Sequence, residues 1–363
     1  MWKKWMALKK TTRSSAVTYA IVIVAYLVIQ LLSSLGLLSS LFTGLLVPLC
    51  TYVILAVSLN LVVGFLGELS LGHAGFMCVG AFASAFFSRC MEDAIPVSGL
   101  RFLIALLIGA AVAGLFGILI GIPVLRLKGD YLAIVTLAFG EIIKNVINVL
   151  FIGRDSNGFH FSTKDAVSLN MEPDGEVLIN GPQGITGTPK DATFTIGVIL
   201  ILISLFLIIN LINSRSGRAI MAIRDNRIAA ESIGINITKY KLMAFAISAA
   251  LAGVAGVLYA HNLSTLTATP KNFGYNMSIM ILVFVVLGGI GSIRGSIIAA
   301  VVLTLLPEML RGLSDYRMLI YAIVLILMML FNWAPKAIEW RERHLSKFRF
   351  FGRRKDEPAG KGA

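Results

Sequence analysis

Long apolar runs dominate this sequence and constrain its fold more than any other feature. Hydrophobic residues make up 57% of the 363-residue chain and charged residues only 14%, whereas charged residues make up about 25% of a soluble globular chain. A helix of about 18 apolar residues is long enough to cross a hydrocarbon core about 30 Å thick. The runs therefore predict an all-α fold, a polytopic bundle of transmembrane helices. We expect about ten spans, and no fewer than about eight, at residues 17–38, 45–66, 70–88, 102–123, 131–151, 194–213, 242–260, 277–291, 295–312 and 318–334.

Basic residues gather at particular ends of these spans. Five lie before the first span, six lie between Arg215 and Lys241, and nine lie between Lys336 and Lys361. Lysine and arginine are enriched in cytoplasmic loops. We therefore predict a multi-pass protein of the cell membrane, with cytoplasmic termini and basic segments close to anionic lipid head groups. No base-stacking aromatic array accompanies the charge, so we do not expect a nucleic-acid partner.

The same pattern predicts the organisation of the chain. Residues 17–335 form a single transmembrane domain between a basic N-terminus, residues 1–16, and a basic tail, residues 336–363. An even number of spans places loop 214–241 in the cytoplasm and loop 152–193 outside. In the outer loop, VSLNM and EVLIN alternate like short strands around turn signals. A short ordered hairpin and a flexible tether both remain open for this loop.

Sequence motifs for catalysis are absent. The chain has no G-x-x-x-x-G-K-[ST] phosphate loop and no H-E-x-x-H, its four histidines are scattered, and its three cysteines show no metal-ligand or disulfide spacing. We therefore expect no catalytic residues, no metal site and no cofactor in this chain. If it moves a solute uphill, the energy comes from an ion gradient or from another subunit.

Two glycine clusters interrupt the apolar runs and suggest a weak, inverted internal repeat. They are GFLGELSLGHAGF at residues 64–76 and GGIGSIRGS at residues 288–296. Broken helices at matching places in two halves indicate a transport pathway, because irregular backbone survives at membrane depth only where it is buried or lines a watery cavity. The alternative is that these glycines only let helices pack closely. The candidate pathway residues are Gly67, Glu68, Ser70, Gly72, His73, Gly288, Gly289 and Gly291.

Glu141 and Lys144 are the clearest ionisable pair inside a span. Their i, i+3 spacing puts them on one face of a helix, where they can neutralise each other. Ionisable residues within spans are costly and are functional candidates by default. Two interpretations stay open, namely a satisfied polar patch that pins this helix to its neighbours and part of a hydrated pore wall.

The cytoplasmic loop 214–241 is the most informative polar stretch. Its middle favours a short amphipathic helix, with isoleucines among charged residues and alanines, and Gly234 stands where that helix should end. Such a helix could lie on anionic lipid. Its small residues and mixed charges also suit docking into a groove on a partner protein.

This loop resembles a known family. GRAIMAIRDNRIAAESIGIN is similar to the coupling loop of bacterial ABC-importer permeases, and more narrowly of the branched-chain amino acid permeases. GELSLGHAGFMCVGAF, RLKGDYLAIVTLAFGEIIKN, NGPQGITG and LGGIGSIRGSIIAA resemble that family's recurring segments in the same order. The resemblance runs from about Gly64 to Pro335, and the longer permease type of the family, the LivM type, is the nearer match.

The resemblance implies a complex. In it, this chain pairs with a second permease, preferably a different one, and both bind two cytoplasmic ATPase subunits, which hold ATP and magnesium. An extracytoplasmic binding protein delivers leucine, isoleucine or valine. The residues that carry over to the ATPase-coupling loop are Arg224, Asp225, Asn226, Ala229, Ala230, Glu231 and Gly234.

The resemblance leaves some features open. Glu231 follows the alanine pair, whereas the general importer consensus E-A-A-x-x-x-G places its glutamate first. Permeases for urea or other small amides share these motifs, so the solute has an alternative within the family. A different class, the ion-coupled secondary carrier, is the other alternative, and a membrane-embedded enzyme lacks the residues it would need.

Overall fold

The computed structural model describes residues 10–92, 94–127, 129–173, 175–310 and 316–333. The chain divides into two compact units, Met1–Thr304 and Leu305–Ala363. In the second unit the principal described element is helix α14, Arg317–Trp333. The start of the basic N-terminus, residues 1–9, and the basic tail, residues 336–363, lie outside the described residues.

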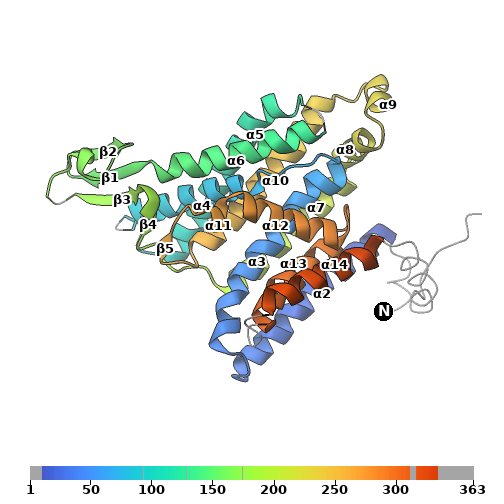
Figure 1. The fold of residues 1–363 in the computed structure, drawn as a ribbon, viewed down its shortest axis with the longest axis horizontal. Coiled ribbons are helices and arrows are strands. Elements are labelled where there is room, and N and C mark those ends of the chain that lie inside the picture. Colours follow the sequence, from blue (N-terminus) through green and yellow to red (C-terminus); the bar gives the residue numbers. More distant parts are fainter. Residues whose placement is uncertain (1–9, 93, 128, 174, 311–315, 334–363) are drawn as a thin grey trace, which may run out of the picture. The chain divides into compact units, whose positions relative to one another are not determined.

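Helices form most of the first unit (Figure 1). Six helical segments in the described part are long and apolar enough to cross a membrane. They confirm a helical transmembrane bundle. Their bounds are Ser15–Ser34, Ser40–Leu66, Ser98–Val124, Phe194–Asn213, Ile237–Ala260 and Pro270–Gly288.

Four further helices coincide with expected spans but are shorter, less apolar or more charged. The total of about ten crossings therefore stays a prediction. These helices are α4 (His73–Cys90), α6 (Asp130–Asn148), α13 (Ile293–Met309) and α14. The others are α2 (Lys10–Ser34), α3 (Ser40–Asn60), α5 (Ser98–Val124), α7 (Phe194–Asn213), α8 (Arg215–Asp225), α9 (Arg227–Ser232), α10 (Ile237–Ala260), α11 (Pro270–Phe273) and α12 (Tyr275–Gly288).

Helix α10 is the centre of packing in the first unit, where it lies against α5, α4 and α3. Small residues permit this close approach, since a Cβ on Gly80 of α4 would lie 2.4 Å from the Cα of Gly253 in α10. Van der Waals packing of small residues drives helix association in lipid, where the surrounding tails are as apolar as the side chains. Leu107 and Leu115 of α5 point away from this core and are exposed, which suits contact with lipid tails.

Loop 152–193, predicted to lie outside, is ordered and forms a small sheet. Strands β1 (Phe151–Asp155), β2 (Gly158–Ser162) and β3 (Glu176–Asn180) pair antiparallel in the order β2-β1-β3. A second, two-stranded sheet joins β4 (Ile185–Thr186) to β5 (Thr265–Leu266). The strand predicted at EVLIN is confirmed as β3.

The prediction of a strand at VSLNM is wrong. Val167–Leu169 is a 3₁₀ turn, and Asn170 follows it in the left-handed region with φ 48°. The cause is local, because the amide of Ser168 donates to Oδ1 of Asp165 at 2.8 Å. Side-chain bonds of this kind compete with the strand ladder. These bonds from Ser168 also lower the pKa of Asp165.

Asp155 holds the β1–β2 turn. Its Oδ1 accepts from the amides of Asn157 and Gly158 at 2.9 and 3.1 Å, and its Oδ2 lies 2.9 Å from Nε2 of His160. Burial works to raise the pKa of Asp155, but hydrogen bonds from the amides of Glu172 and Asn157 and from His160 outweigh it. They hold that pKa below its ordinary value.

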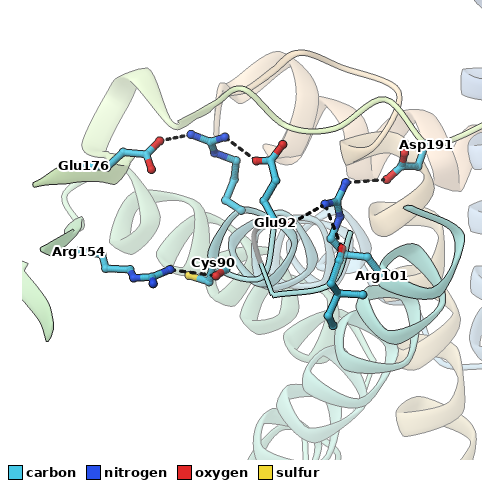
Figure 2. A network of polar contacts seen from close by, with 8 residues as sticks. Cys90, Glu92, Arg101, Arg154, Glu176 and Asp191 are labelled. Carbon is cyan, nitrogen blue, oxygen red and sulfur yellow. Dashed lines mark hydrogen bonds and ion pairs between the residues drawn. The ribbon is translucent and has the colours of Figure 1, made fainter. Parts of the chain in front are cut away.

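Arginine side chains join this sheet to the C-terminal end of helix α4 (Figure 2). Arg154 of β1 donates to the Cys90 carbonyl at 3.0 Å, where α4 ends. Arg89 of α4 pairs with both Glu92 and Glu176 of β3. The sheet and helix α4 are therefore joined by charge-assisted bonds as well as by the chain itself.

Candidate functional site

Loop 214–241, which the sequence places in the cytoplasm, folds into two short helices rather than one. Asn226 separates α8 from α9 because its backbone is extended, with φ −155°, while its side chain caps α9 by accepting from the Ala229 amide at 3.0 Å. Gly234 has φ 85° and follows the end of α9, as its place in the sequence predicts. Asn236 then caps α10 by accepting from the Lys239 amide at 3.0 Å.

A small apolar core holds α9 in place. It consists of Ile223, Ala230 and Ile237, one each from α8, α9 and α10. Two other isoleucines of the loop face away from it, and Ile228 and Ile233 are 80% and 74% exposed. Ile228 of α9 and Ile233, the residue that follows α9, are therefore two large apolar side chains available for contact with a partner.

The residues assigned to the coupling loop lie mostly on this surface. Ala230 alone among them is buried. The exposed ones are Arg224, Asp225, Asn226, Ala229, Glu231 and Gly234.

The first glycine cluster breaks the long segment that begins with α3. Residues Leu61–Leu66 form a π-helical turn, Gly67 follows with φ 78°, and regular structure resumes only at His73. The second cluster also breaks a helix, since α12 ends at Gly288, and Gly289 and Gly291 have φ 94° and 79°.

The two breaks touch each other. A Cβ on Gly64 would lie 2.4 Å from the backbone nitrogen of Gly291. The Gly291 amide donates to Oδ1 of Asn60 at 3.0 Å, and Nδ2 of Asn60 donates to Oγ of Ser296 at 3.0 Å. Both breaks therefore form one polar junction, which we call the glycine junction (Asn60, Gly64, Gly67, Gly291 and Ser296).

Residues from both ends of loop 214–241 contact the first break. From the end of α8, Nη1 of Arg224 donates to the Gly64 carbonyl at 3.0 Å. From the first turns of α10, Lys241 pairs with Glu68. The structure thus brings together Glu68, Gly67, Gly291 and Arg224, which the sequence placed in three separate segments.

Other candidate pathway residues are used in packing. His73 is buried, and its Nε2 lies 2.7 Å from Oγ of Ser58 in α3. Gly72 lets the chain approach α6, since a Cβ there would lie 2.3 Å from the Thr136 carbonyl oxygen. Ser70 differs, because its buried hydroxyl has no hydrogen-bond partner within the described residues.

Glu141 and Lys144 pair with each other on α6. Tyr275 is the first residue of α12, and its amide donates to Oε1 of Glu141 at 2.7 Å. A carboxylate is favourable at this end of a helix because it satisfies a free amide and the helix dipole. The pair therefore joins α6 to α12, and it is not part of the glycine junction.

A cavity of about 370 Å³, with a mixed polar and apolar lining, adjoins the glycine junction. Phe65 contributes from the first break, Gly291 and Ser292 from the second, and Asn213 from the end of α7. The cavity is next to the loop that leads from α7 into α8. No three metal-ligating side chains gather within reach of one ion among the described residues.

Asn60 of the glycine junction and Lys241, the partner of Glu68, are not indicated by the sequence patterns. Asn60 is polar within the long apolar run 45–66, and a buried amide inside a span indicates a specific partner. Lys241 stands at the entrance to a span, where lysine is ordinarily explained by the membrane surface. Its partner Glu68 lies far away along the chain, so the pair has no local signal.

Comparison with known proteins decides the family. The model of the permease component of branched-chain amino acid transport systems matches residues 40–331. The chain belongs to this family. The permease is 37% identical to the high-affinity branched-chain amino acid permease LivM of Salmonella typhimurium, over 79% of this chain and 67% of the relative.

More distant relatives include the LivH permease of Salmonella typhimurium, 24% identical over 77% of this chain and 89% of the relative. The ribose import permease RbsC of Escherichia coli is 28% identical over 76% of this chain and 80% of that protein. No solved structure matches the chain. The resemblance to the LivM type is thus confirmed, and the permease is a multi-pass membrane protein.

Proposed function

We propose that this permease imports branched-chain amino acids as the membrane subunit of an ABC importer, driven by ATP hydrolysed on separate subunits. The observation that carries the proposal is the fixed α9 surface. Ile228 and Ile233 are exposed there among Arg227 and Glu231, while Ala230 anchors the helix from below. A groove in a partner would bury both isoleucines and meet charges of both signs.

Docking on lipid explains this surface less well. A helix that lies on an anionic bilayer presents one continuous apolar face and a basic polar face. In this loop the apolar residues are divided, because Ile220 and Ile223 turn inward while Ile228 and Ile233 turn outward. Asp225 and Glu231 add negative charge that anionic lipid would repel.

The proposed assembly follows from membership of the family. A second permease of the LivH type pairs with this chain, two ATPase subunits bind the α8–α9 loops and hold ATP and magnesium, and an extracytoplasmic protein delivers the solute. This chain performs no catalysis itself. Both termini and loop 214–241 lie in the cytoplasm, and the small sheet lies outside. Within the first unit, helices α8 and α9 lie at the opposite end from the small sheet (Figure 1).

Internal ion pairing supports an ATP-driven importer over an ion-coupled carrier. Glu68 and Glu141, the carboxylates in the candidate pathway, are each paired with a lysine. A proton relay needs carboxylates that exchange protons during transport. Neutralised and largely buried pairs are suited to holding helices together instead.

Co-purification tests the docking surface. We expect the ATPase subunits to co-purify with the wild-type permease and to be lost from Ile228→Asp, because a buried apolar contact would become an unpaired charge. Val167→Asp is the matched control, since Val167 is 85% exposed in the outer loop. Retention of the ATPases by Ile228→Asp would contradict the proposal.

A change of charge at the edge of the same surface has a milder effect. Glu231→Lys should leave the permease inserted and assembled but uncouple solute-stimulated ATP hydrolysis, and normal stimulation would contradict the assignment. The solute is tested separately, by measuring which amino acids, amides or sugars stimulate ATP hydrolysis by the purified complex.

A further inference from the structure

Arg224 points in a different direction from the rest of the docking surface. It stands in the last turn of α8, and its guanidinium reaches the first helix break, where Nη1 donates to the Gly64 carbonyl at 3.0 Å. Its Nε and Nη2 donate to Oδ1 of Asp225 at 3.0 and 2.8 Å. One planar side chain therefore binds the cytoplasmic loop and the broken helix together.

The Gly64 carbonyl needs such a partner. It lies in the last turn of the π-helical segment Leu61–Leu66, where carbonyls have no amide one turn further on to accept from. Arginine side chains commonly satisfy carbonyls at this end of a helix. Here the arginine comes from a distant part of the chain, so the bond ties two elements and does not merely end one.

The glycines of both breaks lie close to this bond. A Cβ on Gly67 would lie 2.5 Å from Cγ of Arg224, and Gly67 itself has φ 78°. On the other side, a Cβ on Gly291 would lie 3.4 Å from the Gly64 carbonyl oxygen and 4.0 Å from Nη1 of Arg224. The Arg224 side chain therefore lies close to Gly64 and Gly67 of the first break and to Gly291 of the second.

We propose that Arg224 is a positioning residue that carries movement of the α8–α9 loop to the glycine junction, and so to both broken helices at once. The inference rests on the proposed function, because it assumes that an ATPase moves this loop. Packed elements shift between discrete arrangements. A displaced α8 pulls on the Gly64 carbonyl, and Gly64 shifts Gly291 through their direct contact.

The test is the coupling ratio of the reconstituted complex, that is, ATP hydrolysed per molecule of solute transported. We expect the coupling ratio to rise about five- to tenfold in Arg224→Ala. This rise corresponds to the lower part of the range of coupling free energies between two sites in a protein. Arg224→Lys should behave like Arg224→Ala, because lysine keeps the charge but cannot bind Asp225 and Gly64 in the same fork.

Arg218→Ala is the matched control. Arg218 is an exposed arginine of the same helix whose Nη1 bonds only locally, to the Asn213 carbonyl at 3.3 Å. Its ratio should stay within about twofold of the wild type. An unchanged ratio in Arg224→Ala, or full rescue by Arg224→Lys, would overturn the inference. Failure of both variants to assemble would overturn it too, because it would show a structural role only.

A double-mutant cycle gives a second, independent test. Gly67→Ala strains the backbone and also displaces the Arg224 side chain. Its effect on the coupling ratio should be smaller in the Arg224→Ala background, where only the strain remains. Equal effects in both backgrounds would contradict the inference. If the wild-type complex shows no ATP-driven transport, it is the proposed function that fails.

Discussion

The ion pair between Glu68 and Lys241 offers the sharpest energetic test of how α10 is joined to the first helix break. Both side chains are largely buried, at 15% and 4% exposure. Lys241 also lies near the N-terminus of α10, where the helix dipole repels a cation. Glu68 is the carboxylate that pairs with this buried ammonium group. Removing one partner of a buried pair costs about 3–5 kcal/mol, whereas replacing both by neutral groups is often nearly neutral.

We expect Glu68→Gln and Lys241→Met each to destabilise the permease by about 2–4 kcal/mol, a lower figure than for full burial because Glu68 keeps some contact with solvent. The double variant should lie within about 1 kcal/mol of the wild type. Lys239→Met is the control, since Lys239 is exposed in the same turn of α10 and should change stability by no more than about 0.5 kcal/mol.

The assay is the apparent melting temperature of the purified permease in detergent, measured for the wild type, both single variants, the double variant and the control. The reasoning predicts two clearly lowered values and a double variant restored to nearly the wild-type value. Single variants as mild as the control would refute it. A double variant as unstable as the sum of the singles would refute it as well, because it would show that the two charges do not interact.

Three further predictions concern other parts of the first unit. Glu141→Ala should destabilise the permease by about 3–5 kcal/mol, because Lys144 is only 7% exposed in its side chain and would be left buried and unpaired; adding Lys144→Met should restore much of the melting temperature. Gly64→Ala should cost about 1–3 kcal/mol or more, since its Cβ would lie 1.9 Å from a side-chain oxygen. Gly44→Ala, with nothing within 4 Å, should cost nothing measurable. Because the pKa of Asp155 is lowered in the folded state, its stabilising effect is complete above about pH 4 and is lost as the pH falls below that value. The protection of amides in the β1–β2 turn against hydrogen exchange, relative to their intrinsic rate at each pH, should therefore stay constant from pH 7 to pH 5 and fall only in stronger acid.

The transmembrane bundle could be predicted because membrane spans are a local property of the sequence. Length and apolar composition are enough to identify a segment such as 194–213, which is helix α7. Gly234 likewise ends a helix through its own backbone freedom. Predictions of this kind need no knowledge of what lies next to the segment.

Errors arose where a short side-chain bond decided the local structure. The isoleucines of loop 214–241 suggest one amphipathic helix, but Asn226 caps a new helix there and separates them into an inward and an outward set. VSLNM alternates like a strand, but the bond between Asp165 and Ser168 turns it into a 3₁₀ turn. Polar capping residues overrode periodicity in both places.

The glycine junction could not be assembled from the sequence at all. Both glycine clusters were identified as breaks, yet nothing in either indicates that Gly64 and Gly291 touch or that Asn60 joins them. Arg224 was assigned to the coupling loop by resemblance, and only the folded chain shows its side chain on the first break. Contacts between distant segments depend on packing, which local patterns do not encode.

Uptake of labelled leucine into liposomes that contain the permease, its partner permease, both ATPases and the binding protein tests the central claim most directly. We predict uptake that requires ATP, stops when the ATPase subunits are catalytically inactive, and persists when ionophores collapse the proton and sodium gradients. Uptake that continues without ATP hydrolysis and disappears with either gradient would contradict the account and identify an ion-coupled carrier.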